Sequence, residues 1–423
     1  MDGCQMRVLS ISVATAGVLF CLIPSPTWAQ GFGTDTQNVL TPAAGGMAGT
    51  SLARPQDVPA AVFGNPATLT QFRGTQFTLG GAWVEGYPTV TRHGLPNPQD
   101  NVSVTSRTQG FLNPAIAVAQ DLRSLGLPGS MGLGLAGTSG LGAEYRGMAP
   151  GTSLVNDFSS EYMVLGLNAG AGLELTDRLS AGASLTLGTG FEQLGLVSNS
   201  AMVHDYALRA TLGVGYELNE CNTLAFCYQT KEAFQFPNAV FVNGAYRDLR
   251  LDQPETLGFG IANRGLMGGN LLLAADVYYK LWEDAAGYSD IFVNQWAFAF
   301  GAQLTHGRLK YRAGYSYNTN PVNHNAGSSF SGMPILQDRL YLLQASETAI
   351  INQHRLTGGI GLADFMFRGM DLDVFAGGLF KASDEFGPNT SSSVAVYYIG
   401  LGLTWRFGAA CGCQQGAECL SVN

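Results

Sequence analysis

The stretch NLLLAADVYYKLW, residues Asn270 to Trp282, alternates between two kinds of side chain along its whole length. One face is wholly apolar and comprises Leu271, Leu273, Ala275, Val277, Tyr279 and Leu281. The other face is mixed and comprises Leu272, Ala274, Asp276, Tyr278, Lys280 and Trp282. Successive side chains of a β-strand point to opposite faces of the sheet. The stretch therefore predicts a strand that presents one face to lipid and the other to a lumen.

The same alternation recurs along the chain. LKYRAGYSYN, residues 309–318, shows it, and MVLGLNAGAGLELTDRLSAGASLTLG, residues 163–188, shows it on both sides of a turn at 176–178. Such runs number about fourteen, an even number, as in bacterial barrels. We place the predicted strands at 73–86, 107–120, 129–145, 159–175, 179–194, 203–218, 223–236, 253–264, 269–284, 293–305, 309–318, 352–364, 370–382 and 394–407.

The connections between these runs alternate in length. Those at 176–178, 219–222, 264–268 and 306–308 are short, and those at 87–106, 146–158, 237–252 and 319–351 are long. Short turns on one side and long loops on the other are typical of outer-membrane barrels. The predicted fold is an all-β, fourteen-stranded antiparallel transmembrane β-barrel with both chain ends on the side of the short turns, in the periplasm.

The composition favours the same class. Charged residues make up 13% of the chain, against about 25% in ordinary soluble domains, and 56 of 423 residues are glycine. After the first thirty residues, no apolar run approaches the roughly 18 residues of a spanning helix. A soluble β-sandwich would also alternate, but its outward face would be polar. The net charge is −9 and no basic run occurs, so we expect no nucleic-acid partner.

Both ends of the chain carry features of an exported barrel. Residues 1–29 combine Arg7, an apolar run and a small final residue, Ala29, as a secretory signal peptide does. YIGLGLTWRF, residues 398–407, alternates and ends on Phe407, which resembles the terminal signal read by the barrel-assembly machinery. We therefore expect an outer-membrane protein that contacts lipid, depends on that machinery for assembly and is a monomer.

Residues 30–72 lie before the first strand and lack its alternation. They are rich in glycine and alanine and contain the turn-forming triplet Asn65-Pro66-Ala67. A fourteen-stranded barrel is wide enough to leave a lumen. We predict that this segment sits inside the barrel as a plug. The expected domains are the signal peptide 1–29, the plug 30–72, the barrel 73–407 and a periplasmic tail 408–423.

The plug sequence carries a resemblance to a known family. GFGTDTQNVLTPAAGGMAGTSLARPQDVPAAVFGNPATLTQF, residues 31–72, resembles the N-terminal hatch of the FadL family, whose marker is an Asn-Pro-Ala triplet, here Asn65, Pro66 and Ala67. The resemblance covers nearly all of 31–407 through DQPETLGFGIANR, YYKLWED, LKYRAGYSYNTNPV and HRLTGGIGL. The family transports long-chain fatty acids and hydrocarbons across the outer membrane.

The resemblance implies passive uptake of a hydrophobic small molecule. Ligand would be caught at the outer loops, enter an apolar pocket and leave through a gap at a kink in the third strand, beside the hatch triplet. The matching run is GSMGLGLAGTSGLGAEY, where Gly137, Gly140 and Gly142 are candidates for the kink. The alternative is that these glycines only ease wall packing. Two departures concern ligand capture: 195–202 is short, and 319–351 is long, with a predicted short helix in residues 336–351.

Five residues are candidate ligand contacts in the lumen. Strand parity directs Lys280, Arg312 and Arg355 inward, where they would either hold a carboxylate or pair with lumen acids. The available acids are Asp276, Asp371 and Asp373. Phe63 and Trp282 would line an apolar pocket, and Trp83 belongs either to that pocket or to an interfacial aromatic girdle.

Other functions find little support in the sequence. The five histidines are scattered without metal-ligand spacing, and no nucleophile–base–acid set stands out, so we expect no metal, no cofactor and no enzyme activity. An open porin for polar solutes and a structural barrel without transport are the alternatives. Cys411, Cys413 and Cys419 lie after the last strand, where an oxidising compartment permits a disulfide.

Overall fold

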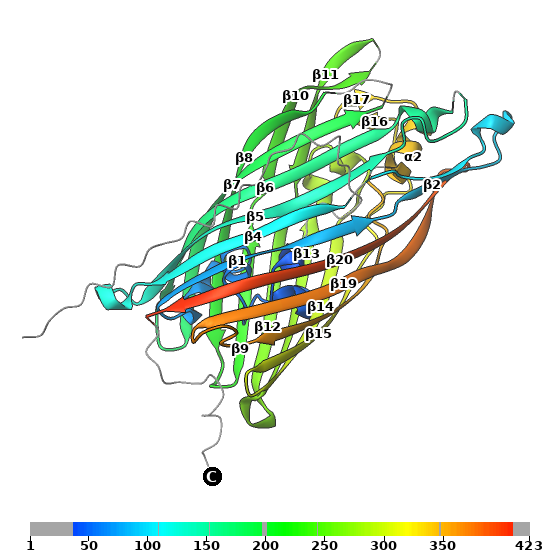
Figure 1. Ribbon diagram of the computed structural model, residues 1–423. Helices are drawn as coiled ribbons and strands as arrows, with labels where there is room; N and C mark the ends of the chain where they lie inside the picture. The colour runs from blue at the N-terminus through cyan, green and yellow to red at the C-terminus, as the bar shows by residue number, and fades with distance from the viewer. Residues whose placement is uncertain are drawn as a thin grey trace, which may run out of the picture.

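A computed structural model describes residues 37–108, 110–151, 153–196, 201–242, 244–346 and 348–408. The predicted signal peptide and the cysteine-containing tail fall outside these residues. Within them, fourteen antiparallel strands form a closed barrel, because the last strand pairs with the first (Figure 1). In spatial order they are β1 (Thr75–Gly86), β4 (Phe111–Asp121), β5 (Gly129–Glu144), β6 (Ser159–Glu174), β7 (Leu179–Gly195), β8 (Val203–Glu217), β9 (Asn222–Gln229), β12 (Glu255–Leu266), β13 (Leu271–Leu281), β14 (Gln295–His306), β15 (Leu309–Asn318), β18 (His354–Leu362), β19 (Met370–Phe386) and β20 (Thr390–Phe407).

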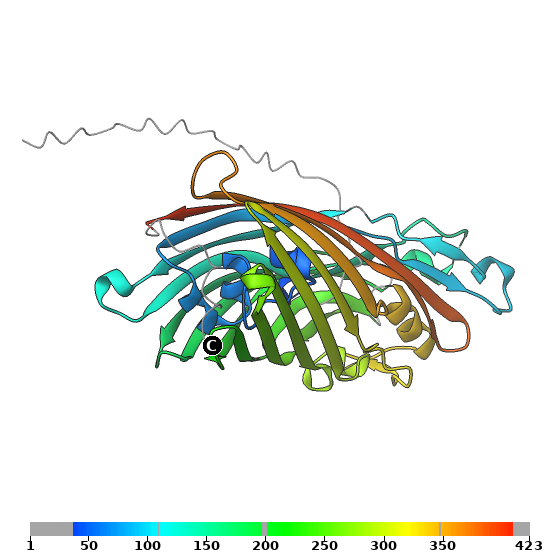
Figure 2. The ribbon, with the colours of Figure 1, turned by 90° about the horizontal axis from the view of Figure 1, so that it is seen from below.

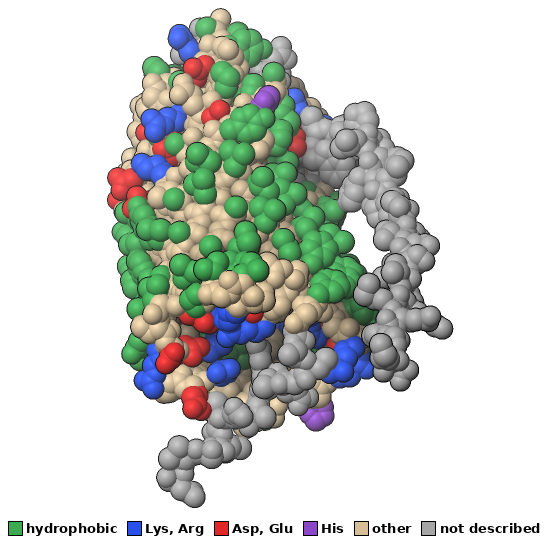
Figure 3. All heavy atoms as spheres, turned by 90° about the vertical axis from the view of Figure 1, so that its left-hand side faces the viewer, with side chains coloured by type: hydrophobic (Ala, Val, Ile, Leu, Met, Phe, Trp, Pro, Cys, Tyr) green, Lys and Arg blue, Asp and Glu red, His purple; other side chains and the backbone are tan. Residues whose placement is uncertain are grey.

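The predicted alternation is confirmed in the wall. On β13, Ala274, Asp276, Tyr278 and Lys280 are buried and face inward, whereas Leu273 is exposed on the outside. Leucines facing outward on neighbouring strands give the wall an apolar exterior. Figure 3 shows hydrophobic side chains around the middle of one face, with charged side chains gathered toward its two ends. Among the described residues, no helix has the length and the apolar run that crossing a membrane requires.

The two ends of the barrel differ. One end, here called the turn end, carries short connections with η5 (Arg123–Leu125) and η7 (Met267–Gly269). The other, the loop end, carries long connections that contain β2 (Thr89–Arg92), β3 (Ser103–Thr105), η4 (Pro98–Asp100), η6 (Leu154–Asp157), β10 (Glu232–Val242), β11 (Ala245–Gln253), η8 (Trp282–Asp284), η9 (Tyr288–Asp290), β16 (Ser329–Phe330), β17 (Met333–Pro334) and α2 (Gln337–Ser346). Helix α2 confirms the helix predicted in residues 336–351.

One predicted strand is wrong. Residues 223–236 do not form a single wall strand, because β9 ends at Gln229 and β10 pairs only with β11 in a separate hairpin. Phe234 and Phe236 are fully buried inside the loop end, and Phe234 packs against Gly188 and Gly190 of β7. Burial of these two rings accounts for the departure of the chain from the wall. Alternation continues across the break, so the sequence period does not reveal it.

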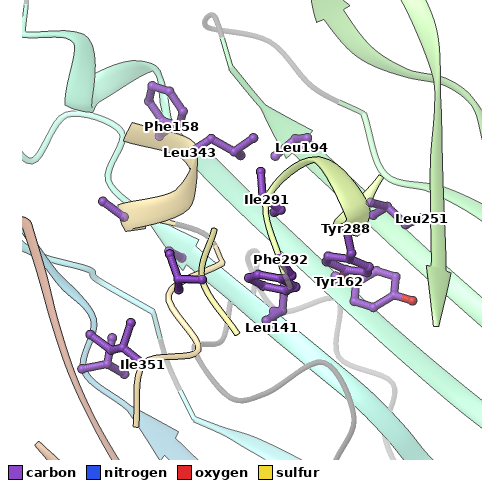
Figure 4. Packing of buried hydrophobic residues seen from close by; sticks show 14 of the residues in the cluster. Leu141, Phe158, Tyr162, Leu194, Leu251, Tyr288, Ile291, Phe292, Leu343 and Ile351 are labelled. Carbon is purple, nitrogen blue, oxygen red and sulfur yellow. The ribbon is translucent and has the colours of Figure 1, made fainter. Parts of the chain in front are cut away.

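Several connections of the loop end contribute to an apolar cluster (Figure 4). Tyr288 and Phe292 stack with ring centroids 5.5 Å apart, and Trp282 meets both rings edge-on. Tyr162 of β6 lies beside Tyr288 in the same view. We call this group the outer cluster; its rings pack against one another.

Residues 37–72 lie inside the barrel (Figures 1 and 2). They form η1 (Gln37–Leu40), η2 (Ala44–Met47), α1 (Val58–Phe63) and η3 (Pro66–Gln71). Proline stands at the second position of α1 and the first of η3, where its missing N–H costs no helical hydrogen bond. Nearly all of the segment is buried, and η2 and η3 contact strands on different sides of the lumen.

Candidate functional site

Two carboxylates hold the inner segment, residues 37–72, in place. Asp57 accepts hydrogen bonds from the backbone N–H groups of Ala43, Ala44 and Ala60, at 2.6, 3.0 and 2.8 Å. Burial raises the pKa of Asp57, and these three donors oppose the rise. Asp276 projects inward from β13 and accepts from the N–H groups of Ser51 and Leu52, at 2.7 and 3.1 Å. The first carboxylate ties the segment to itself, and the second ties it to the wall.

An ion pair fastens the segment near the turn end. Arg54 Nη2 lies 3.0 Å from Glu217 Oε1 at the end of β8, and Arg54 Nε donates to Thr223 Oγ1 of β9 at 3.2 Å. Burial lowers the pKa of Arg54 to about 10, so the guanidinium stays charged at neutral pH. The glutamate is partly exposed, so the contribution of this pair to stability is small.

The triplet Asn65-Pro66-Ala67 packs directly on wall glycines. A Cβ added to Gly213 of β8 would overlap Asn65 Oδ1, and one added to Gly182 of β7 would overlap the Ala67 nitrogen. Asn65 Nδ2 donates to Leu52 O at 3.0 Å and to Val214 O at 3.2 Å, and Asn65 Oδ1 accepts from Ala67 N–H at 3.1 Å. Close approach between segment and wall thus requires glycine at these wall positions.

We expect Gly213→Val to loosen the inner segment. The added side chain overlaps Asn65, and overpacking of this kind costs about 1–3 kcal/mol. Backbone amides of α1 and η3 should exchange with deuterium at least about tenfold faster than in the parent protein. Gly215→Val is the matched control, because Gly215 lies two residues along the same strand face and its Cβ would meet only Ser180 Oγ. Equal protection of α1 and η3 in the two variants would contradict the expectation.

The wall has an interrupted seam between β4 and β5. Pairing of these strands runs from Asp121↔Ser130 to Ala115↔Ala136 and stops there, although both strands continue toward the loop end. Pro114 follows on β4 and offers no N–H, which disfavours further pairing. On β5 the register with β6 shifts between Gly137 and Ser139, as in a β-bulge. We call this region the seam.

A small cavity of about 20 Å³, enough for one water molecule, adjoins the seam on its inner side. It is lined by Asn38, Leu40, Thr41, Phe63, Asn113, Ala115, Ala136, Gly137 and Thr138. The lining therefore joins η1 and α1 of the inner segment to β4 and β5 of the wall. We call it the seam cavity. A Cβ added to Gly137 would overlap Asn113 Oδ1, so the Asn113 side chain occupies the space left at the bulge.

The structure brings two sequence-predicted site residues from different elements together. Phe63 and Gly137 line the same cavity. The triplet at 65–67 lies farther round the wall, against β6, β7 and β8. Gly140 and Gly142 pair with β6 in regular register, so the bulge lies at Gly137 and not at these two glycines.

The predicted lumen contacts lie elsewhere in the barrel. Arg312 Nη1 donates to Asp373 Oδ1 at 2.6 Å, in agreement with the pairing alternative, and its side chain is 1% exposed. Lys280 faces inward and is buried, and Arg355 faces inward from β18. Trp282 belongs to the outer cluster.

Three further residues named from the sequence have defined places in the barrel: Trp83, Asp276 and Asp371. Trp83 is 41% exposed on the outer surface, which agrees with the girdle and not with a pocket. Asp371 interacts with Lys310 and Arg406 at the turn end, and Asp276 accepts hydrogen bonds from the backbone of the inner segment.

Sequence reasoning missed Asn113 and Asn38. The signal for Asn113 was present, because a proline at 114 inside an otherwise regular strand marks interrupted pairing. Asn38 lies in a segment without period, and only the fold brings it to the seam. Among the described residues, no three His, Cys, Asp or Glu side chains gather as a metal site would require.

Comparisons with known proteins point to one architecture. No model of a known protein family matches the chain, and no curated protein matches it. The Pseudomonas putida toluene transporter TodX matches with a TM-score of 0.62 and 17% identity, over 90% of this chain and 100% of that one. A Pseudomonas aeruginosa FadL homologue matches with a TM-score of 0.66 and 14% identity, over 90% of this chain and 100% of that one. The Ralstonia pickettii toluene transporter TbuX matches with a TM-score of 0.61 and 18% identity, over 90% of this chain and 99% of that one. The chain therefore has the fold of these three barrels along nearly its whole length.

Proposed function

We propose that the chain is an outer-membrane channel of the FadL family that admits hydrophobic small molecules by diffusion. Long-chain fatty acids and aromatic or aliphatic hydrocarbons are the candidate cargo. The likeness to toluene transporters and to a FadL homologue supports this proposal, as does the hatch-like sequence of residues 31–72. The inner segment acts as the hatch of the barrel.

The surface of the barrel supports a location in the outer membrane. Outward faces of the strands are apolar, and closure of the barrel gives each of the fourteen wall strands two hydrogen-bonded neighbours, with the pairing interrupted at the seam. The predicted signal peptide directs export, and the turn end faces the periplasm with both chain ends. The protein acts as a monomer, with the barrel-assembly machinery and membrane lipid as its partners and no cofactor.

The observation that carries the proposal is the seam with its cavity. The inner segment fills the middle of the lumen, so a ligand entering from the loop end meets a blocked axis. The wall pairing ends beside a cavity that this same segment lines. A sideways exit between β4 and β5 into the membrane follows from that arrangement, and it suits a hydrophobic cargo because the cargo never needs to cross water.

The alternatives fit these contacts less well. A general porin needs a water-filled axial route, whereas the inner segment is buried and anchored by Asp57 and Asp276. A structural barrel needs neither an interrupted wall nor a cavity at the interruption. The similar proteins of known name are transporters, which favours transport over catalysis.

The test uses a variant with a larger side chain at the seam between β4 and β5. In Gly137→Leu the new side chain competes with Asn113 for the bulge, and we expect the initial rate of uptake of radiolabelled toluene by cells lacking other such channels to fall by about tenfold. Gly358→Leu is the matched control, since a Cβ at this outward-facing wall glycine of β18 meets no atom closer than 3.8 Å. Uptake at the parent rate in Gly137→Leu, with the barrel correctly inserted, would remove the seam as the exit.

A further inference from the structure

The turn between β18 and β19, residues 363–369, carries three exposed apolar side chains at the turn end of the barrel. Their exposed fractions are 41%, 73% and 54%, in the order Phe365, Met366 and Phe367. Figure 2 shows this connection, in orange, standing out from the wall. On the same two strands, Ile360 and Val374 are paired with each other and exposed on the outer face. The apolar exterior of the wall therefore continues into the turn.

Arginine side chains gather around one carboxylate of the same turn. Arg406 Nη2, at the end of β20, lies 3.3 Å from Asp364 Oδ1. Arg308, from the turn between β14 and β15, donates to the backbone oxygen of Asp364. The pKa of Asp364 is lowered by the Gly369 N–H and by three guanidinium groups, those of Arg406, Arg308 and Arg368. Three arginines that are distant in sequence thus lie around a single aspartate.

The positive charge of this group exceeds its negative charge. Asp371 of β19 is the second carboxylate, and its oxygens lie 2.7 Å from Arg406 Nη2 and 3.6 Å from Lys310 Nζ. The group therefore sets four cations against two carboxylates: Arg308, Lys310, Arg368 and Arg406 against Asp364 and Asp371. Basic side chains beside exposed apolar ones are the combination that attracts anionic lipid at a membrane surface.

We infer that the 363–369 turn and its arginines form a binding site for an anionic phospholipid in the leaflet at the turn end. The apolar side chains of the turn insert among the acyl chains, and the guanidinium groups hold the headgroup phosphate. Arginine suits this role because its planar fork donates two hydrogen bonds to phosphate oxygens. Phosphatidylglycerol keeps a net negative charge, whereas the ammonium of phosphatidylcholine offsets its own phosphate, so the site prefers the former. The inference concerns lipid around the barrel and does not depend on the cargo.

Quenching of tryptophan fluorescence by brominated lipids tests the site on the full-length protein in phosphatidylcholine vesicles. Trp405 of β20 is the reporter, because it pairs across the strands with Met370, the first residue after the turn. Its signal is the fluorescence that Trp405→Phe removes. Brominated phosphatidylglycerol should associate at Trp405 at least about fivefold more strongly than brominated phosphatidylcholine, since each arginine near a membrane surface contributes a factor of about five.

Variants of the arginines separate charge from packing. Arg368 is exposed, so Arg368→Gln removes one positive charge and should lower the preference for phosphatidylglycerol about fivefold, whereas Arg368→Lys should retain most of it. Arg178→Gln is the matched control and should leave the preference unchanged. Arg178 is also exposed in a short connection at the turn end, but that connection joins β6 and β7, across the barrel from β18 and β19 in the strand order.

A second reporter tests insertion of the turn into lipid. Met366→Trp, made in the Trp405→Phe background, should be quenched by both brominated lipids; quenching by neither would place the turn in water and overturn the inference. Equal association of the two lipids at Trp405 of the parent protein would also overturn it, as would an unchanged preference in both Arg368→Gln and Arg308→Gln. Folding of each variant is checked by its heat-dependent shift in electrophoretic mobility. No cargo enters the experiment, so its failure would leave the channel function standing.

Discussion

Deleting residues 30–72 is expected to convert a closed barrel into an open, conducting pore. The fourteen strands close without these residues, because β1 begins at Thr75 and pairs with both β4 and β20. A barrel of this strand number leaves a lumen that its wall side chains do not fill. Ala43, Met47 and Leu52 of the segment are fully buried in that lumen. Recordings in planar lipid bilayers should show steady conductance for the truncated protein and a closed baseline for the full-length chain.

The deletion should also separate leakage from transport. Hydrophobic uptake that saturates with ligand concentration depends on the seam cavity, and the deletion removes four of its lining residues: Asn38, Leu40, Thr41 and Phe63. Saturable uptake should therefore be lost while ions pass. Correct folding of the truncated barrel is checked by its heat-dependent shift in electrophoretic mobility. A folded, truncated barrel that stays electrically silent would contradict the assignment of the segment as a hatch.

Asp276→Leu is expected to release the inner segment from the wall. Asp276 Oδ2 accepts from the Ser51 and Leu52 N–H groups, and hydrogen bonds to a charged acceptor contribute about 1.5–3 kcal/mol each. The substitution also leaves two buried N–H groups without an acceptor. We expect brief, repeated openings in bilayer recordings and faster deuterium exchange at 43–53, with the strands of the wall unchanged.

Asp276→Asn is the informative control, because the amide keeps one oxygen that can accept the hydrogen bonds of the Ser51 and Leu52 N–H groups. The wall anchor should then be weakened but present, and openings should be rarer than in the leucine variant. If Asp276→Leu stays as closed as the parent protein, the other contacts of the segment hold it without this carboxylate. The glycines that meet η2, Gly301 and Gly314, would then be the positions to enlarge next.

Period-two alternation predicted nearly the whole wall, and the physical reason is simple. Leu133 faces outward and Gly134 packs against the inner segment. Because the two faces of a wall strand have different environments, apolar and small or polar residues alternate along its sequence. The same rule failed at residues 230–236. There the interior of the loop end is as apolar as lipid, so Phe234 and Phe236 continue the pattern after the chain has left the wall.

The site was less predictable than the wall. Phe63 was predicted as an aromatic that would line an apolar pocket, and Gly137 came from the family resemblance; both line the seam cavity. Asn38 and Asn113 are far apart in sequence, so only the closed barrel places them together. Strand parity placed Arg312 inside the barrel but could not decide whether its partner is a ligand or an acid such as Asp373. Parity gives the side of the wall on which a side chain lies and not the distance between side chains.

Anomalous diffraction from crystals of the full-length protein soaked with 4-bromotoluene tests the sideways route most directly. The account predicts a bromine peak at the seam, between β4 and β5 and beside Asn113. A peak on the barrel axis, between the inner segment and the turn end, with the seam cavity empty, would show that ligand passes through the middle of the barrel and would contradict the account.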